Sequence, residues 1–282
     1  MSDTQAQKGR VLVIAGSDSG GGAGIQADIK SIMAQGAYAT TAISALTAQN
    51  TLGVQEIMDV PPRFVARQMT SILSDIGADI MKTGMLATRA VIEAVAQVRD
   101  EMRDEARALP MLVDPVMVAT SGDRLLQDEA MDALRDLLVN QAYLVTPNLP
   151  EASLLTRRDV DTLDDMKRAA DTLMSAGCHA ALIKGGHAND KAVTDLLALQ
   201  SGMEVFEHAR IDTTNTHGTG CTLASAIAGQ MANAIGADAP RDSQGRPDDA
   251  TLKTATETAL DYVHRAIITA PHIGQGNGPL GH

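Results

Sequence analysis

The chain has 282 residues, a formal net charge of −12 at pH 7 and 44% hydrophobic residues. A chain of this length can bury a sizeable core, as one large α/β domain or as two smaller domains. The acidic balance argues against nucleic acid or an anionic membrane surface as a partner, because both need clustered lysine and arginine. With two Phe, three Tyr and no Trp, the core must be aliphatic, which suits helices packed on a parallel sheet.

Cysteine usage and the first residues indicate the compartment. Cys178 and Cys221 are the two cysteines, which provide no disulfide framework and fit a reducing environment. The polar start of the chain lacks the apolar segment of a secretory signal, and no uncharged apolar run approaches the ~20 residues that span a bilayer. We therefore expect a cytoplasmic protein without a membrane partner, and a disordered N-terminal arm over residues 1–9.

The first elements run strand, glycine-rich loop, helix. Val11–Ala15 is a continuous apolar run, typical of a strand buried on both faces. The loop over 16–24 follows it, and a helix is expected over about 25–35. The loop matches neither GxGxxG nor GxxxxGK[ST]. Its four glycines within 20–24 imply a close approach of backbone to another group, since a tight turn alone needs one or two.

The same alternation continues to the C-terminus. Further strands are expected over 37–48, 54–60, 79–83, 111–113, 143–146, 180–183, 192–199 and 203–211. Helices are expected over 61–75, 88–106, 127–140, 149–156, 162–176, from near 218, and over 250–270. This rhythm predicts a parallel sheet covered on both faces. Without a linker to divide it, residues 10–282 are predicted to form one α/β domain.

The stretch 211–228 carries the sharpest local signal. Gly218-Thr219-Gly220-Cys221 precedes a helix on which Leu223 and Ile227 fall on one face. Glycines at a helix start let backbone N–H groups and the positive end of the helix dipole converge, which makes an anion site with phosphate as the usual occupant. The same N–H groups would stabilise a thiolate, so a lowered pKa is predicted for the Cys221 thiol. An ordinary capped helix with a small residue at its start is the alternative.

Polar residues collect where the other predicted strands end, and these ends share one rim of a parallel sheet. Asn148 and Glu151 fit either a capping box or an oxygen pair that arranges water around Mg²⁺. Lys184 stands after a strand and before two glycines, which suits phosphate contact. Asp114 before proline is either a turn residue or part of this site. His217, at the cap of the helix, is interpreted as structural.

Read together, several segments resemble one known family. AGSDSGGGAGIQAD, TAQNTLGV, KTGML, VDPVMVATSGDRLL, TPNLPEA, IKGGH and NTHGTGCT occur in this order over about 10–235. They are similar to the hydroxymethylpyrimidine/phosphomethylpyrimidine kinases of thiamine biosynthesis, within the ribokinase-like superfamily. The resemblance implies a single ribokinase-like α/β domain with a central, mostly parallel sheet, usually in a homodimer. It implies transfer of the ATP γ-phosphate to the pyrimidine hydroxymethyl group and then to the monophosphate, with ATP and Mg²⁺ required.

The resemblance also implies roles for individual residues. The aminopyrimidine would be surrounded by Gly16, Ala23, Asp28, Gln49, Met85 and Val116. The nucleotide phosphates would be contacted by Asn148, Lys184, Thr219 and Gly220, and Mg²⁺ would be organised by Asp114, Asn148 and Glu151. The catalytic set would be Cys221, Lys184, Gly218 and Gly220. In this set Cys221 takes the place of the aspartate base of the sugar kinases.

Three alternatives remain open on the sequence. A pyridoxal kinase of the same fold has a similar flat substrate with a hydroxymethyl arm. A hydrolase could use Cys221 and His217, although adjacent placement at a helix cap offers no orienting third group. A non-catalytic pyrimidine-binding regulator is disfavoured because Lys184 and Glu151 are present. The Ser-Gly-Asp composition of 120–124 permits a closing lid.

Overall fold

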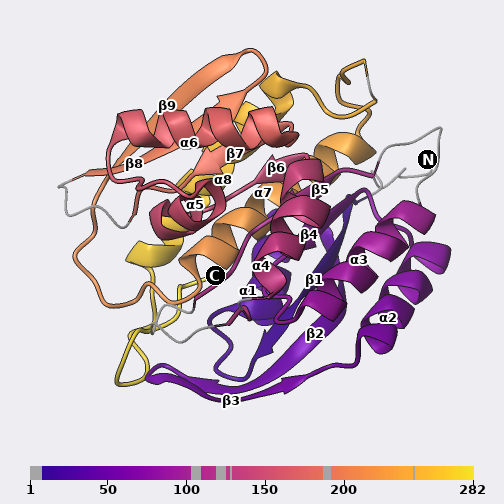
Figure 1. Ribbon diagram of the computed structural model, residues 1–282. Coiled ribbons are helices and arrows are strands. Elements are labelled where there is room, and N and C mark those ends of the chain that lie inside the picture. The colour runs from indigo at the N-terminus through magenta and orange to yellow at the C-terminus, as the bar shows by residue number, and fades with distance from the viewer. Residues whose placement is uncertain (1–7, 103–108, 119–124, 128, 187–191, 244) are drawn as a thin grey trace, which may run out of the picture.

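The alternation of strands and helices forms one nine-stranded sheet in the order β3-β2-β1-β4-β5-β6-β7-β8-β9. The computed structural model describes residues 8–102, 109–118, 125–127, 129–186, 192–243 and 245–282 (Figure 1). The strands are β1 Arg10–Asp18, β2 Tyr38–Asn50, β3 Gly53–Asp59, β4 Ile80–Thr83, β5 Met111–Val113, β6 Leu144–Val145, β7 Ala180–Ile183, β8 Ala192–Leu199 and β9 Gly202–Ala209. From β2 through β7 the neighbouring strands are parallel, whereas β3, β8 and β9 pair antiparallel at the two edges.

Helices cover both faces of the sheet (Figure 1). Those of the described chain are α1 Gly24–Ala34, α2 Pro62–Asp75, α3 Arg89–Glu101, α4 Ala130–Ala133, α5 Leu149–Thr156, α6 Leu163–Ala176, α7 Thr219–Gly236 and α8 Asp249–Ile268. Alternate residues of β1 point to opposite faces. Leu12 and Ile14 pack with α2 to α6, and Val11 and Val13 pack with α1, α7 and α8. The predicted aliphatic parallel sheet between two helical layers is confirmed.

Several predicted boundaries differ from those observed. The helix expected over 127–140 is α4 followed by a π-helical turn at Leu134–Leu138 and a 3₁₀ turn at Val139–Gln141. The expected arm over 1–9 is too long, because Gly9 is buried and its N–H donates to Asn233 Oδ1 at 3.1 Å. Residues 1–7, and the lid expected at 120–124, lie outside the described residues. No helix within the described ranges has the length and apolarity that a membrane crossing requires.

The topology determines where a ligand can bind. The order of the strands reverses at β1, which has β2 on one side and β4 on the other. At such a point the loops that leave the carboxyl ends of neighbouring strands diverge, and a crevice opens between them. The glycine-rich loop after β1 and the Gly84-Met85 turn after β4 both lie there. Helix α7 enters the same region, and its buried Leu223, Ile227 and Met231 confirm the predicted apolar face.

Candidate active site

A cavity of about 830 Å³ opens at the carboxyl ends of the parallel strands. A volume of this size suits a small ligand together with a cofactor. Thirteen of the fourteen site residues predicted from the sequence line it. They are Gly16, Ala23, Gln49, Met85, Asp114, Val116, Asn148, Glu151, Lys184, Gly218, Thr219, Gly220 and Cys221. The structure brings these residues together at one cavity, and Asp28 is the exception.

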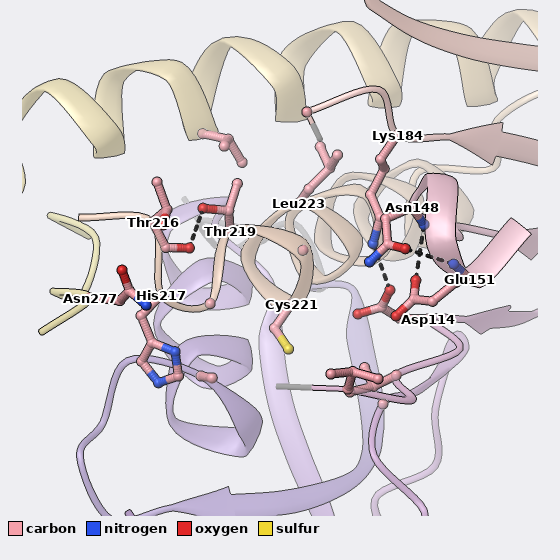
Figure 2. Close-up of a pocket in the computed structure, with 18 of the residues that line it drawn as sticks. Asp114, Asn148, Glu151, Lys184, Thr216, His217, Thr219, Cys221, Leu223 and Asn277 are labelled. Carbon is pink, nitrogen blue, oxygen red and sulfur yellow. Dashed lines mark hydrogen bonds and ion pairs between the residues drawn. The ribbon is translucent and has the colours of Figure 1, made fainter. Parts of the chain in front are cut away.

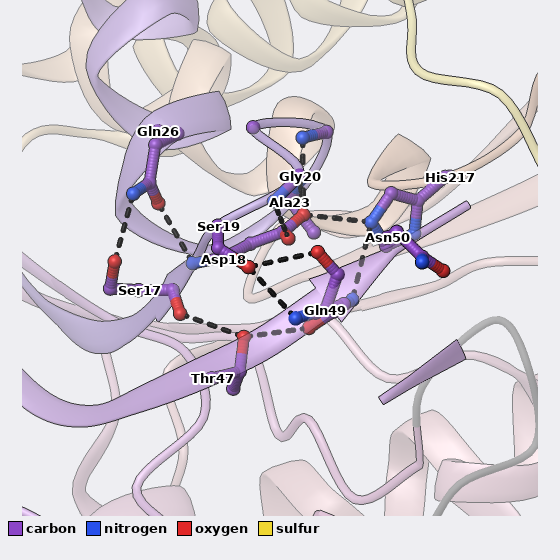
Figure 3. Close-up of polar contacts among 12 residues, drawn as sticks. Ser17, Asp18, Ser19, Gly20, Ala23, Gln26, Thr47, Gln49, Asn50 and His217 are labelled. Carbon is purple, nitrogen blue, oxygen red and sulfur yellow. Dashed lines mark hydrogen bonds and ion pairs between the residues drawn. The ribbon is translucent and has the colours of Figure 1, made fainter. Parts of the chain in front are cut away.

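Asp18 organises the glycine-rich loop (Figure 3). Its carboxylate accepts the backbone N–H groups of Gly20, Gly22 and Ala23 at 2.7, 3.1 and 2.8 Å. Burial opposes its charge, but the hydrogen bonds from His217 and these N–H groups hold its pKa below the ordinary value. The loop therefore wraps around the carboxylate of Asp18, one of its own residues. Ala23 and Gly24, at the start of α1, are brought to the cavity wall.

Gln49 meets His217 beside this loop, as Figure 3 shows. His217 Nε2 lies 2.8 Å from Asp18 Oδ2 and 3.3 Å from Gln49 Nε2. Because an ionised carboxylate can only accept, His217 Nε2 donates to Asp18 and leaves the Gln49 NH₂ group without an acceptor there. Thr47 Oγ1 lies 3.0 Å from both Ser17 O and Gln49 Oε1, and its single proton cannot serve both. The Gln49 amide can thus offer a donor and an acceptor to a ligand.

Apolar residues form the wall opposite this polar corner. Met85 is 7% exposed and Val116 packs against it. Gly16 has to be small here, since a Cβ on it would lie 3.1 Å from Met85 Sδ. Two apolar surfaces beside one amide make a slot for a flat heterocycle with polar edges.

Asp28 is not part of this slot, and its predicted ligand contact is wrong for the structure. Its side chain is fully buried between α1, β4 and α7, where Oδ1 lies 2.8 Å from Lys82 Nζ and accepts the Ser225 hydroxyl. Lys82 stands near the carboxyl end of β4, but its side chain is 0% exposed and points inward. A short strand does not reveal from sequence which of its faces a side chain occupies.

The start of α7 presents backbone N–H groups to the cavity, as the sequence predicted for an anion site. Gly218 caps it with φ 82°, and a Cβ there would collide with the Gly22 carbonyl oxygen. This left-handed conformation and close approach both require glycine. In the described part of the chain, the N–H groups of Gly220 and Cys221 have no hydrogen-bond acceptor. They face the cavity at the positive end of the 18-residue helix.

Cys221 lies between the two halves of the site (Figure 2). Its thiol is half-buried and lines the cavity. The predicted lowering of its pKa is wrong for this state of the protein. Burial raises the pKa to about 12, although Lys82 and the Gly24 N–H act in the opposite direction. The desolvation of the thiolate outweighs the helix N-terminus, a balance that only the tertiary surroundings determine.

Lys184 and two carboxylates form the other half (Figure 2). Lys184 Nζ lies 2.9 Å from Asp114 Oδ1, which also accepts from Thr146 Oγ1 at 3.1 Å. Burial opposes the charge of Lys184, but Asp114 and Glu151 raise its pKa. A Cβ on Gly220 would lie 3.0 Å from the ammonium, so Lys184 reaches the start of α7 only because that position is glycine.

Asn148 and Glu151 form a capping box at the start of α5. Asn148 Oδ1 accepts the Glu151 N–H at 2.8 Å, and Glu151 Oε2 accepts the Asn148 N–H at 2.9 Å. The capping interpretation is confirmed. Burial raises the pKa of Glu151 to about 7, despite Lys184 and with a further contribution from Asp114. A buried carboxyl beside a second one would bind a cation favourably, so a metal role stays open alongside the cap.

The sequence interpretation missed two residues that shape the site. His217, read as structural, lines the cavity and holds Asp18. Its position directly before Gly218-Thr219-Gly220 was the available signal. Asp195 on β8 accepts the Gly185 N–H at 2.9 Å and fixes the turn after Lys184. Nothing local marks Asp195, because β8 joins the site only through the edge of the sheet.

The C-terminal segment closes the cavity at the β2–β3 turn. Asn277 N–H donates to Thr51 O at 2.9 Å, and His217 N–H donates to Gly278 O at 3.1 Å. A Cβ on Gly276 or Gly278 would collide with Thr51 or Asn215. The glycine-rich ending of the chain is therefore explained by a close fit between two distant loops.

Comparison with known proteins agrees with this geometry. Residues 18–281 match the family model of phosphomethylpyrimidine kinase. The chain is 43% identical over 274 residues to the hydroxymethylpyrimidine/phosphomethylpyrimidine kinase of Rhizobium meliloti, with 96% of each chain covered. It is also 43% identical over 275 residues to the thiamine biosynthesis bifunctional protein ThiED of Geobacter sulfurreducens. There the match covers 98% of this chain but 52% of that protein, so the chain spans about half its length.

A solved structure supports the same conclusion for the fold. The ADP complex of Bacillus subtilis pyridoxal kinase superimposes with a TM-score of 0.82 and 32% identity, and 98% of both chains is covered. The expected ribokinase-like architecture is thereby confirmed. The cavity, the sequence matches and this fold lead to one assignment: the chain belongs to the phosphomethylpyrimidine kinase family.

Proposed function

We propose that the protein transfers the γ-phosphate of ATP to 4-amino-5-hydroxymethyl-2-methylpyrimidine and then phosphorylates the resulting monophosphate, as a step in thiamine biosynthesis. One observation carries the proposal. A single cavity joins an amide-and-apolar slot for a flat ring to an anion site at the start of α7. Lys184 lies at the phosphate side, and Cys221 stands between the two. That arrangement brings a ring-borne hydroxyl and a transferring phosphoryl group into one space.

The ring end supplies orientation. A 4-aminopyrimidine presents an N–H donor beside a ring-nitrogen acceptor, and the Gln49 amide can answer both. Met85 and Val116 give the ring its apolar faces. Ala23 closes the slot from the start of α1. The hydroxymethyl arm would then point toward Cys221.

The phosphate end supplies charge. Phosphoryl transfer passes through a loose transition state, so the protein mainly positions groups and neutralises charge on the equatorial oxygens. The N–H groups of Gly220 and Cys221 and the ammonium of Lys184 would contact those oxygens. Thr219 also lines this part of the cavity. Cys221 would accept the proton of the attacking hydroxyl in its thiolate form.

The residues at the end of β5 and the start of α5 fit Mg²⁺. This ion keeps several waters and is usually held through one or two carboxylates together with substrate phosphates. Asp114 and Glu151 provide two carboxylates, and Asn148 provides an amide oxygen beside them. When bound, the ion would neutralise phosphate charge. The described residues hold no cluster of three or more His, Cys, Asp or Glu side chains suited to a metal.

Glu151→Gln should test the carboxylate through pH. Because folding raises the Glu151 pKa to about 7, its stabilising contribution is complete at low pH and is lost as pH rises through that value. The uncharged glutamine still accepts the Asn148 N–H. We therefore expect the variant to gain about 1–3 kcal/mol relative to the parent between pH 4.5 and pH 8 without metal. Chemical denaturation at both pH values measures this gain, and Glu93→Gln on exposed α3 is the matched control. A gain that does not depend on pH would contradict the assignment.

Gln49→Leu should weaken pyrimidine binding. The substitution leaves the amino group and the ring nitrogen without partners, which costs about 1–3 kcal/mol. Steady-state kinetics should show a higher KM for the pyrimidine and an unchanged KM for ATP. Gln55→Leu on β3, outside the cavity, is the control. An unchanged pyrimidine KM would remove Gln49 from the slot.

We further propose a homodimer that acts in the cytoplasm, where ATP is supplied. The exposed β2–β3 ribbon carries apolar side chains at its edge, with Leu46 paired to Met58 and exposed by 43% and 63%. Leu52 in the turn is 63% exposed. An apolar edge of this kind is an expected interface. Light scattering should give twice the chain mass, and Met58→Asp should shift it toward the monomer. A parent chain that stays monomeric at micromolar concentration would refute the dimer.

The function itself is tested by resolving products. Purified protein with ATP, Mg²⁺ and hydroxymethylpyrimidine should form the monophosphate and then the diphosphate. Monophosphate alone would limit the proposal to a salvage kinase. Because the pyridoxal kinase of Bacillus subtilis shares the fold, pyridoxal is tested in parallel. Equal or better turnover of pyridoxal would favour that second function.

A further inference from the structure

A fully buried ion pair lies behind the cavity. Lys82 on β4 and Asp28 on α1 are each 0% exposed, with Nζ and Oδ1 2.8 Å apart. Ser225 Oγ donates to the same Asp28 oxygen at 2.6 Å. Among the described residues, Asp28 Oδ2 has no partner. Burying such a pair carries a large desolvation cost. Apolar residues of similar volume often give a fold the same stability, so packing alone does not require these charges.

The pair lies on the side of the site where Cys221 stands. Ser225 follows Cys221 by one helical turn, so both side chains lie on the same face of α7. Directly after β4, a Cβ added to Gly84 would be 3.3 Å from Lys82 Nζ. Gly84 lines the cavity. The ammonium therefore lies behind the cavity wall, on the side of α7 that carries Ser225 and Cys221.

Charges from four elements act on that thiol. They are Lys82 from β4, Asp28 from α1, Asp114 from the end of β5 and Lys184 from the end of β7. Burial is the largest influence and raises the Cys221 pKa, and Lys82 is the strongest opposing one. The influence is mutual. Burial disfavours the charge of Lys82, but Asp28, Cys221 and Asp114 raise its pKa. In a buried region of low dielectric constant such coupling is strong.

We propose that Lys82 is a positioning residue for Cys221: its ammonium, held by Asp28, stabilises the thiolate form of Cys221 that removes the proton from the substrate hydroxyl. The proposal deepens the function proposed above and rests on it for the proton transfer. As the O–H bond of the substrate breaks, an S–H bond forms on Cys221. The freed oxygen attacks the γ-phosphorus and ADP leaves. Lys82 keeps all its protons throughout.

Thiol alkylation tests this without substrate. Iodoacetamide reacts with the thiolate, so its rate at Cys221 between pH 8 and pH 10 follows the thiolate fraction. Lys82→Met should slow alkylation of Cys221 by about tenfold for each unit by which the pKa rises. Asp28→Asn keeps the ammonium and removes its competing anion. It should speed alkylation by a similar factor.

The opposite signs separate charge from structure. Each variant leaves a buried group unpaired and lowers stability, so a purely structural role would change both rates in the same direction. Cys178 is an internal control, since it is 2% exposed and outside the cavity, and its alkylation reports opening of the fold. Mass spectrometry assigns the label to each cysteine. Equal changes at Cys221 and Cys178, or the same direction in both variants, would overturn the proposal.

A second comparison covers loss of folding. If Lys82→Met does not fold, Asp28→Asn decides alone, and a rate at Cys221 that is unchanged or slower overturns the proposal. In the kinase assay, the acidic limb of the plot of kcat against pH should move to higher pH with Lys82→Met and to lower pH with Asp28→Asn. Opposed alkylation rates in a protein without kinase activity would support the Lys82–Cys221 coupling while the proposed function fails. Kinase activity together with unchanged alkylation rates in both variants would support the proposed function and overturn the Lys82–Cys221 coupling.

Discussion

Cys221→Ala should lower kcat by about 10²- to 10⁴-fold, the range that one positioned proton acceptor contributes. The loss should fall on kcat, because the proposed nucleotide contacts at Lys184 and the Gly220 N–H would remain in place. Nucleotide titration by calorimetry should therefore give a dissociation constant close to that of the parent. Single-turnover measurements with saturating pyrimidine separate the chemical step from product release.

The chain supplies a matched control for this variant. Cys178→Ala removes the other thiol, which is buried just before β7 and does not line the cavity. It should lose some thermal stability and keep its kcat. Parental turnover by Cys221→Ala would remove the thiol from the mechanism. Equal losses in both cysteine variants would trace the effect to packing.

Lys184→Met should lower kcat by about 10²- to 10³-fold, comparable with the loss of one donor to a developing oxyanion. The ammonium pairs with Asp114 at 2.9 Å. Because Gly220 beside it has no side chain, a phosphate at the start of α7 could reach the ammonium. Its removal would also leave Asp114 and Glu151 without a fixed cation between them and the proposed phosphate position. We therefore expect the KM for ATP to rise as well.

Two further variants make this result specific. Lys253→Met removes a partly exposed lysine paired with Glu204 on β9, and its kinetics should match those of the parent. Lys184→Arg keeps the charge, but the larger guanidinium meets the backbone of Gly220 and should restore little activity. Full activity in Lys184→Met would place the phosphate elsewhere.

Much of the site could be read from short segments. Gly218-Thr219-Gly220-Cys221 before an apolar helix predicts an anion site from local backbone geometry alone, and the structure places free N–H groups there. The capping box of Asn148 and Glu151 was predictable for the same reason, since its two hydrogen bonds span three residues. The strand ends of a parallel sheet necessarily share one edge, so their convergence followed from the order of elements.

Other features depend on side chains that are distant in the sequence. Asp28 reads as a ligand residue in its motif, yet Lys82 and Ser225 hold it behind the cavity. The helix start predicts a lowered pKa for Cys221, yet burial raises it to about 12. Both differences have one cause. Desolvation and pairing depend on which elements pack together, and no local pattern contains that information.

The sequence by itself determined the fold class, the family and the position of the glycine turn where we propose that phosphate binds. These depend on periodicity and on glycine positions, which act over a few residues. Only the tertiary structure decided that His217 lines the cavity and holds Asp18, and that Asp28 is held behind the cavity by Lys82 and Ser225. Burial and electrostatic coupling are properties of packed surfaces, so they exist only once β1, β4, α1 and α7 have come together.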